Sequence, residues 1–204
     1  MKQIILMADV VKSSAQDPPR LAQDFRAAVH WVNIGYRPYI KSPLTITLGD
    51  EFQGVIENKS HGLEIIIALE EYIISKSLDF KLRYILHEGE INTPVNRERA
   101  YEMLGTGLTD ARKQLIQMKK QSSRFRISVA QGDELDKMMK VIEHFINSWH
   151  PKDRSTVAGF LAGHSYKAMA KIEQKDDSTL WRRRKSLAID EYLLCKELLQ
   201  HLVQ

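Results

Sequence analysis

Apolar and polar positions along the first 130 residues recur with the periods of both strands and helices. The run Gln3–Val10 is apolar almost throughout, which predicts a strand buried on both faces. Residues 13–20 interrupt it, and Pro18 with Pro19 opens a helix. The apolar face of that helix is formed by Leu21, Phe25, Ala28 and Val32.

The next residues predict a hairpin over Leu44–Ile56, with its turn at Gly49, Asp50 and Glu51. Further helices are expected over Gly62–Ser75 and Leu108–Lys120, and further strands over 80–91 and 124–130. The resulting order is strand, helix, hairpin, helix, strand, helix, strand. It predicts a mostly antiparallel sheet of the ferredoxin-like or palm type, covered by helices.

Beyond residue 131 the pattern is helical only. Helices are predicted over Asp133–Trp149, Lys152–Leu161, Ser165–Glu173 and from Ser178 onward. We therefore expect an α+β protein, with a sheet domain over residues 1–131 and an all-α domain over residues 132–204.

Composition limits the compartment and the classes of partner expected for the protein, but it does not identify the function. One cysteine, Cys195, excludes a disulfide framework and suits a reducing compartment. The apolar start, Ile4–Ala8, is too short for a signal peptide, and no segment reaches membrane-spanning length. We expect a cytoplasmic protein that does not enter membranes. The net charge of +4 permits nucleic-acid or nucleotide binding.

Two carboxylates are candidates for a metal site. Asp9 ends the first strand, and Asp50 lies at the hairpin turn. If these strands are neighbours, the two carboxylates converge, as in magnesium sites that serve phosphoryl transfer. The alternative is structural, because Asp commonly caps backbone groups in turns.

The segment 165–185 has the pattern of two short helices joined by a tight turn. Ser165 is a candidate cap for the first helix, and Ser178 for the second. Ala170 and Leu180 have the ten-residue spacing of the apolar positions that pack in a helix-turn-helix. DNA contact is expected from the second helix, through Ser178, Thr179, Trp181, Arg182, Arg183, Arg184 and Lys185.

Two alternatives to DNA contact remain open for these helices. A run of basic residues is also typical of a solvated helix face, and a helix-turn-helix can contact proteins. The last segment, Leu187–Val203, has an apolar stripe that predicts packing on its own domain or a homodimer seam. The stripe consists of Leu193, Leu194, Leu198, Leu199 and Val203, with Tyr192 beside it.

Four segments resemble the motifs of class III nucleotidyl cyclases: ILMADVVKSS, ITLGDEFQG, LRYILHEGEI and GTGLTDARKQL. Together with the C-terminal half, they resemble the SatD family of bacterial proteins over nearly the whole chain. The resemblance implies an N-terminal cyclase-like domain and a C-terminal helix-turn-helix domain. It also implies that Asp9 and Asp50 are metal ligands.

The chain departs from the cyclase pattern where catalysis needs it. Ile46 stands where cyclases have a base-reading Lys, and Thr109 and Lys113 stand where they have Asn and Arg. Lys lacks the bidentate fork of Arg, so stabilisation of a transferring phosphate is weakened. We expect Glu51, Arg83, Thr109 and Lys113 to contact a ligand rather than to catalyse.

The leading hypothesis is a DNA-binding transcriptional regulator. Its cyclase-like domain is then a catalytically degenerate module that binds a ligand, such as a nucleotide with magnesium, or that dimerises. The alternative is a metal-dependent nucleotidyl- or phosphoryl-transfer enzyme that uses Asp9 and Asp50. A third possibility is a scaffold whose cyclase-like domain only dimerises.

Overall fold

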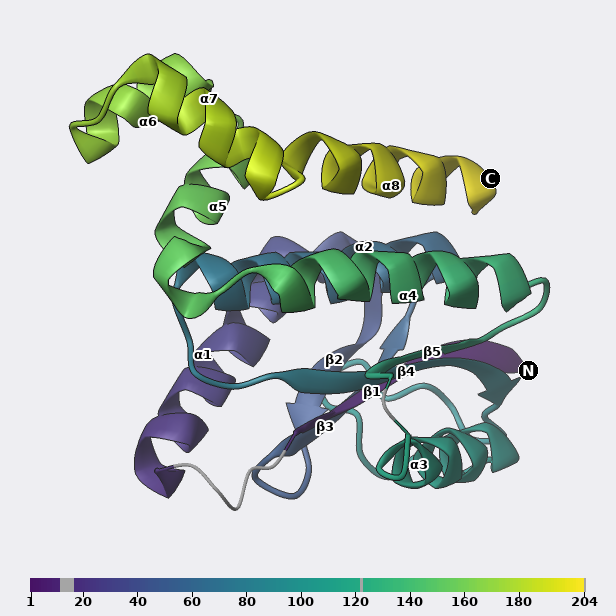
Figure 1. The fold of residues 1–204 in the computed structure, drawn as a ribbon. Helices are drawn as coiled ribbons and strands as arrows, with labels where there is room; N and C mark the ends of the chain where they lie inside the picture. Colours follow the sequence, from purple (N-terminus) through teal and green to yellow (C-terminus); the bar gives the residue numbers. More distant parts are fainter. Residues whose placement is uncertain (12–16, 122, 204) are drawn as a thin grey trace.

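In the computed structural model, which describes residues 1–11, 17–121 and 123–203, a central sheet has helices on both faces (Figure 1). The strands and helices follow the predicted order up to residue 128. The predicted interruption at residues 13–16 lies outside the described residues. In chain order the elements are β1 (Lys2–Val10), α1 (Pro18–Gly35), η2 (Arg37–Tyr39), β2 (Ile40–Ile46), β3 (Glu51–Ile56), α2 (Lys59–Ser75), β4 (Leu82–Glu90), α3 (Thr106–Met118), β5 (Phe125–Ser128), α4 (Asp133–Ser148), η3 (Pro151–Asp153), α5 (Arg154–Leu161), α6 (Tyr166–Glu173), α7 (Asp177–Ser186) and α8 (Ile189–Leu202).

Within the described residues, five strands form one mixed sheet in the order β2-β3-β1-β4-β5. The pairs β1–β3, β1–β4 and β2–β3 are antiparallel, and β4–β5 is parallel. The predicted, mostly antiparallel sheet is therefore confirmed. Strand β1 lies in its centre, with Ile5 to Ala8 at most 1% exposed, which explains its nearly continuous apolar sequence.

The two faces of the sheet have different covers. Helices α2 and α4 lie on one face, and α3 lies on the other (Figure 1), while the buried side of α1 joins the same core as α2 and α4. Because side chains alternate along a strand, Leu6 and Ala8 join the larger core under α1 and α2, whereas Ile5 and Met7 pack with α3. Asp9 continues the second set and therefore lies on the α3 face.

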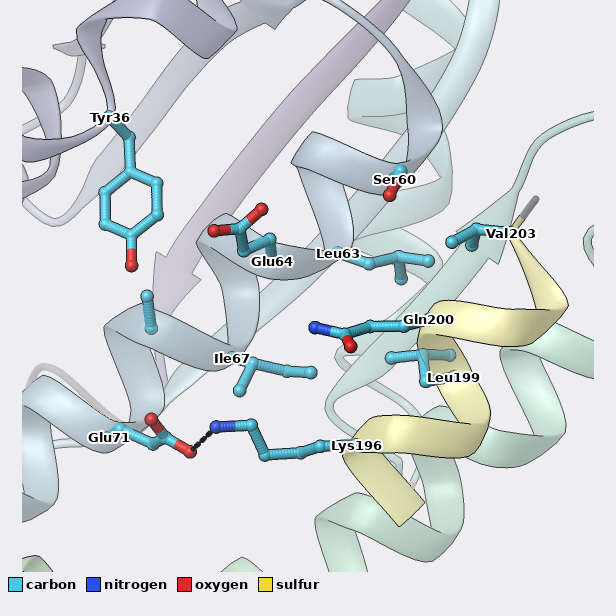
Figure 2. A pocket seen from close by; sticks show the side chains of 11 residues that line it. Tyr36, Ser60, Leu63, Glu64, Ile67, Glu71, Lys196, Leu199, Gln200 and Val203 are labelled. Atoms are coloured by element: carbon cyan, nitrogen blue, oxygen red, sulfur yellow. Dashed lines mark hydrogen bonds and ion pairs between the residues drawn. The ribbon is translucent and has the colours of Figure 1, made fainter. Parts of the chain in front are cut away.

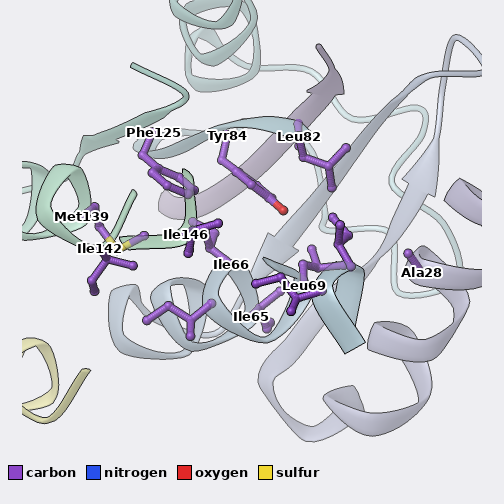
Figure 3. Close-up of a cluster of buried hydrophobic side chains, with 14 of the residues drawn as sticks. Ala28, Ile65, Ile66, Leu69, Leu82, Tyr84, Phe125, Met139, Ile142 and Ile146 are labelled. Atoms are coloured by element: carbon purple, nitrogen blue, oxygen red, sulfur yellow. The ribbon is translucent and has the colours of Figure 1, made fainter. Parts of the chain in front are cut away.

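The larger core joins the sheet to both halves of the chain. In Figure 3, Ile66 of α2 and Ile142 of α4 lie close to Tyr84 and Phe125 of the sheet. The same cluster continues through buried residues of α5, α6, α7 and α8. Side chains on both sides of residue 132 thus share one apolar core, and the predicted boundary there stays a prediction.

The C-terminal helices differ in two ways from the sequence prediction. The long helix expected from Ser178 onward is wrong, because the chain breaks between α7 and α8 at Ala188, which is left-handed with φ 50°. The break allows Leu187 to turn inward, where its carbonyl accepts a hydrogen bond from the Trp149 indole at 2.8 Å. Ser178 is also not the cap, since α7 begins at Asp177 after Asp176.

Candidate functional site

The predicted site residues Asp9, Asp50 and Glu51 lie near one end of the sheet, and Asp9 and Glu51 share the face that α3 covers. The strand register pairs Asp9 with Glu51 of β3 and with Arg83 of β4, so these three side chains share a face. Asp50 precedes Glu51, and its carbonyl accepts a hydrogen bond from Val10 at 2.9 Å. The hairpin thus brings Asp50 to the end of β1, as the sequence predicted.

Asp9 is held by two cations rather than left open. The residue is 3% exposed. Arg83 Nη1 donates to both of its oxygens, at 2.9 and 3.0 Å, and Lys119 Nζ lies 3.2 Å from Oδ2. Arg83, expected to contact a ligand, therefore bonds to a neighbouring strand.

Helix α3 and its C-cap residue, Lys119, supply the cations that the sequence analysis missed. Arg112 bonds to the Glu51 carboxylate at 2.5 Å, in the same way that Lys119 bonds to Asp9. The two cations are seven residues apart, a spacing that places them on one helix face and that is visible in the sequence. Their side chains are 39% and 55% exposed, so both also reach solvent.

The other two predicted ligand contacts on α3 lie elsewhere. Thr109 and Lys113 are exposed, and Lys113 lies 3.6 Å from the Asp110 carboxylate, one turn away on the same helix. The structure therefore does not bring them to Asp9 or Glu51. Any ligand contact by these two residues stays a prediction.

The carboxylate cluster does not fit a magnesium ion as it is arranged. Magnesium binds carboxylate oxygens directly, and both Asp9 oxygens already accept hydrogen bonds from Arg83. In residues 1–11, 17–121 and 123–203, no group of three or more His, Cys, Asp and Glu side chains is placed to hold a metal. Magnesium at Asp9 and Asp50, and the transfer enzyme that would need it, stay predictions that require Arg83 and Lys119 to move.

Asp9 is expected to make stability depend on pH. Burial raises the pKa of Asp9, with a smaller contribution from Asp50, against the opposing fields of Arg83 and Lys119. The folded state then binds this proton more tightly than the unfolded chain does. The stability contribution of Asp9 is therefore fully present below its ordinary pKa and is lost as pH rises through the raised value.

The measurement is urea unfolding of the wild type and of Asp9→Asn between about pH 4 and about pH 7. The free energy of unfolding of the wild type, minus that of the variant, should fall as pH rises. A difference that grows with pH would show that Arg83 and Lys119 lower the pKa of Asp9 by more than burial raises it.

A second candidate site is formed by α6 and α7, which are joined by a short turn. Ser165 caps α6, as predicted, by accepting a hydrogen bond from Ala168 at 3.2 Å. Gln174 ends α6 in the left-handed conformation, with φ 55° and ψ 46°. Ala170 and Leu180 are 3% and 1% exposed. Both residues are therefore buried, at the positions where the sequence predicted packing between the two helices.

The basic residues of α7 differ in how strongly they are held. Arg183 forms an ion pair with Asp153 at the start of α5. Arg184 and Lys185 share Asp190 of α8, at 2.7 and 2.8 Å. In the described part of the chain, Arg182 has no carboxylate partner and bonds to the Ser178 carbonyl at 3.2 Å.

The outward face of α7 therefore consists of a few residues. Ser178, Arg182 and Lys185 are exposed and follow one another at helical spacing. Trp181 lies beside them at 49% exposure, and Thr179 is also exposed. Arg183 and Arg184 are half-buried and stabilise the contacts of α7 with α5 and α8.

The apolar stripe predicted on the last helix is divided between two faces of α8. Tyr192 and Leu199 are buried, whereas Leu194 and Leu198 are 54% and 43% exposed. Leu202 continues the exposed row at 44%. The first set confirms packing within the chain, and a homodimer seam stays a prediction.

The fold and these sites define an α+β protein with a five-stranded mixed sheet and a helical C-terminal part. The chain belongs to the SatD family, whose model matches residues 3–203. No curated protein matches it. Among solved structures it is similar to one described as "Structure of a bacterial light-regulated adenylyl cyclase", with 9% identity and a TM-score of 0.44, over 62% of this chain and 74% of that one. None of the helices in the described residues is long and apolar enough to cross a membrane.

Proposed function

We propose that this protein is a DNA-binding transcriptional regulator whose α6 and α7 form a helix-turn-helix. The observation that carries the proposal is the outward face of α7, with Ser178, Trp181 and Arg182 in the half next to the turn and Lys185 near its other end. A recognition helix presents its N-terminal residues to base edges and its basic residues to bases and phosphates. The left-handed Gln174 and the buried pair Ala170 and Leu180 support this arrangement.

The surroundings of α7 also fit a helix that inserts into a groove. In Figure 1, α6 and α7 lie at one end of the molecule, away from the sheet. The ion pairs of Arg183 with α5 and of Arg184 with α8 fix the helix, because each ties it to a neighbouring element. Such support positions the exposed side chains, which is what specific DNA contact requires.

For the N-terminal domain we propose a cyclase-like ferredoxin or palm module that binds an anionic ligand such as a nucleotide, or that dimerises. Arg112 of α3 and Lys119, which follows α3, support an anionic ligand, because both reach solvent beside the carboxylate cluster. A phosphate would compete with Glu51 and Asp9 for these two cations. Binding would therefore release two buried carboxylates, one of which already has a raised pKa.

A gel-shift titration tests the DNA proposal. The probes are a duplex from upstream of the protein's own gene and an unrelated duplex of equal length. Arg182→Ala is expected to weaken binding by roughly tenfold and to lower the slope of log affinity against log salt by about one, because one phosphate or base contact is lost.

The matched control is Arg20→Ala, which removes the same charge from an exposed side chain on α1. It should leave both affinity and salt slope nearly unchanged. Absence of salt-sensitive binding, or binding that survives Arg182→Ala combined with Trp181→Ala and Lys185→Ala, would rule out α7 as the DNA-contacting helix.

A further inference from the structure

A cavity of about 420 Å³ lies between α2 and α8, within the size range of small-molecule sites (Figure 2). Its apolar lining consists of Leu63 and Ile67 from α2 and of Leu199 and Val203 from the C-terminal segment. In Figure 2, Leu199 and Ile67 face each other across the space. The cavity thus has room and an apolar surface for a ligand body.

An adjoining cavity of about 570 Å³ extends the space along α2 towards α1 and α5. The two cavities share Tyr36, Ala68 and Glu71 as lining residues. Trp31 and Tyr72 add aromatic surface, with their rings stacked at 4.6 Å. Together the cavities form one groove along α2, which we name the α2 groove.

In the cavity of Figure 2, carboxylates outnumber ammonium groups on the polar side of the α2 groove, whereas the adjoining cavity adds the ammonium group of Lys76. Glu71 Oε1 accepts hydrogen bonds from Tyr192 at 2.9 Å and from Lys196 at 2.5 Å. Both donors use the same oxygen, and no donor from the described part of the chain bonds to Oε2. Glu64 lies two turns earlier on α2 and forms no ion pair within the described residues. The cavity of Figure 2 is thus lined by two carboxylates and one ammonium group.

The pKa of Tyr36 indicates the sign of the electrostatic field in the groove. Its ring lies beside Glu64 on the polar side (Figure 2). Burial raises the pKa of its phenol, and the carboxylates of Glu64 and Glu71 raise it further. A negative field disfavours an anion in this place and favours a cation.

We propose that the α2 groove binds a small organic cation, an ammonium group carried on an apolar body. The ammonium would bond to Glu71 Oε2 and lie close to Glu64 and the ring of Tyr36, since carboxylates and aromatic faces both attract cations. The apolar body would lie between Ile67 and Leu199.

The position of the groove links such a ligand to the C-terminal helices. The ligand ammonium on Oε2 and Lys196 on Oε1 would share the Glu71 carboxylate and repel each other, and Lys196 is one of two polar contacts that tie α8 to Glu71. Helix α8 follows α7 directly after Ala188. Occupation of the groove therefore loosens α8, the neighbour of α7. The proposal goes beyond DNA binding and does not depend on it.

The experiment titrates the full chain with hexylamine, 1-hexanol and hexanoate while amide chemical shifts are recorded. The three probes share an alkyl chain and differ in charge. Hexylamine should shift the signals of Tyr36, Glu71 and Lys196 in a saturable way, and the other two should bind more weakly. Equal or tighter binding of hexanol or hexanoate, or no saturable shift at these residues, would overturn the proposal.

Two substitutions with opposite expected effects sharpen the test. Glu71→Gln should weaken hexylamine binding by about tenfold, because a charged acceptor is lost. Lys196→Met should tighten it, because a neighbouring ammonium that repels the ligand is removed. The control is Glu191→Gln on an exposed position of α8, which should change nothing. Glu64→Gln, at an exposed position, provides a second weakening variant if Glu71→Gln does not fold. Failure of Lys196→Met to tighten binding would overturn the placement of the ligand ammonium on the Glu71 carboxylate beside Lys196.

Discussion

Replacing Arg124 with methionine is expected to lower the free energy of unfolding by about 3–5 kcal/mol. Arg124 precedes β5 and is 6% exposed. Its guanidinium donates to both Glu70 oxygens, at 3.1 and 2.9 Å, and its backbone N–H donates to Glu143 at 3.0 Å. The residue thus ties α2 and α4 to the start of β5. Methionine fills similar space but leaves the buried Glu70 carboxylate without its cation.

The measurement is urea unfolding at neutral pH, with Arg20→Met as the control. Arg20 pairs with Asp24 on the surface of α1, so its loss should change stability by less than about 0.5 kcal/mol. The double variant Arg124→Met with Glu70→Leu should recover part of the loss, because the unpaired carboxylate is gone. An Arg124→Met variant as stable as the wild type would show that the pair contributes nothing net.

Replacing Gly107 with alanine is expected to destabilise the protein by about 3 kcal/mol, near the upper end of the usual range for overpacking. Gly107 of α3 lies directly against Gly89 of β4. A Cβ atom on Gly107 would come within 2.5 Å of the Gly89 carbonyl carbon. The backbone of Gly89 cannot shift as readily as the end of a flexible side chain. Helix α3 must therefore move away from the sheet. That movement would also draw Arg112 and Lys119 away from the carboxylates.

The control for this substitution is Gly35→Ala at the end of α1, where an added Cβ would meet nothing within 4 Å. It should be neutral or stabilising by a few tenths of a kcal/mol, because it restricts the unfolded chain. Chemical shifts around Asp9 should change in Gly107→Ala and not in Gly35→Ala. Unchanged stability and unchanged shifts in Gly107→Ala would contradict the close approach of α3 to β4.

Local patterns predicted the elements well because burial imposes its period on the sequence. The apolar run of β1 reflects its central position in the sheet, and the apolar face of α1 follows from its contact with that sheet. The cap at Ser165 and the buried positions Ala170 and Leu180 were likewise predictable, since they depend on near neighbours. The break at Ala188 was not predictable. It depends on the burial of Leu187 against residues distant in the chain, such as Trp149.

Of the candidate sites, too, some features were predictable from the sequence and others were not. The sequence indicated Asp9 and Asp50 together, since a hairpin turn next to a central strand follows from element order. It did not reveal that Arg83 and Lys119 hold Asp9, because these contacts join residues far apart in the chain. The basic run of α7 was plain in the sequence, but its ion pairs with Asp153 and Asp190 were not.

By itself, then, the sequence determined which segments form strands and helices, in what order, and which residue types are available for chemistry. Tertiary structure alone decided which charges neutralise one another, which basic residues of α7 stay exposed, and that α2 and α8 enclose the α2 groove. The physical reason is the separation along the chain between the residues that interact. Periodicity, caps and turns are set by residues a few positions apart, whereas ion pairs and cavities arise only where packing brings distant segments into contact.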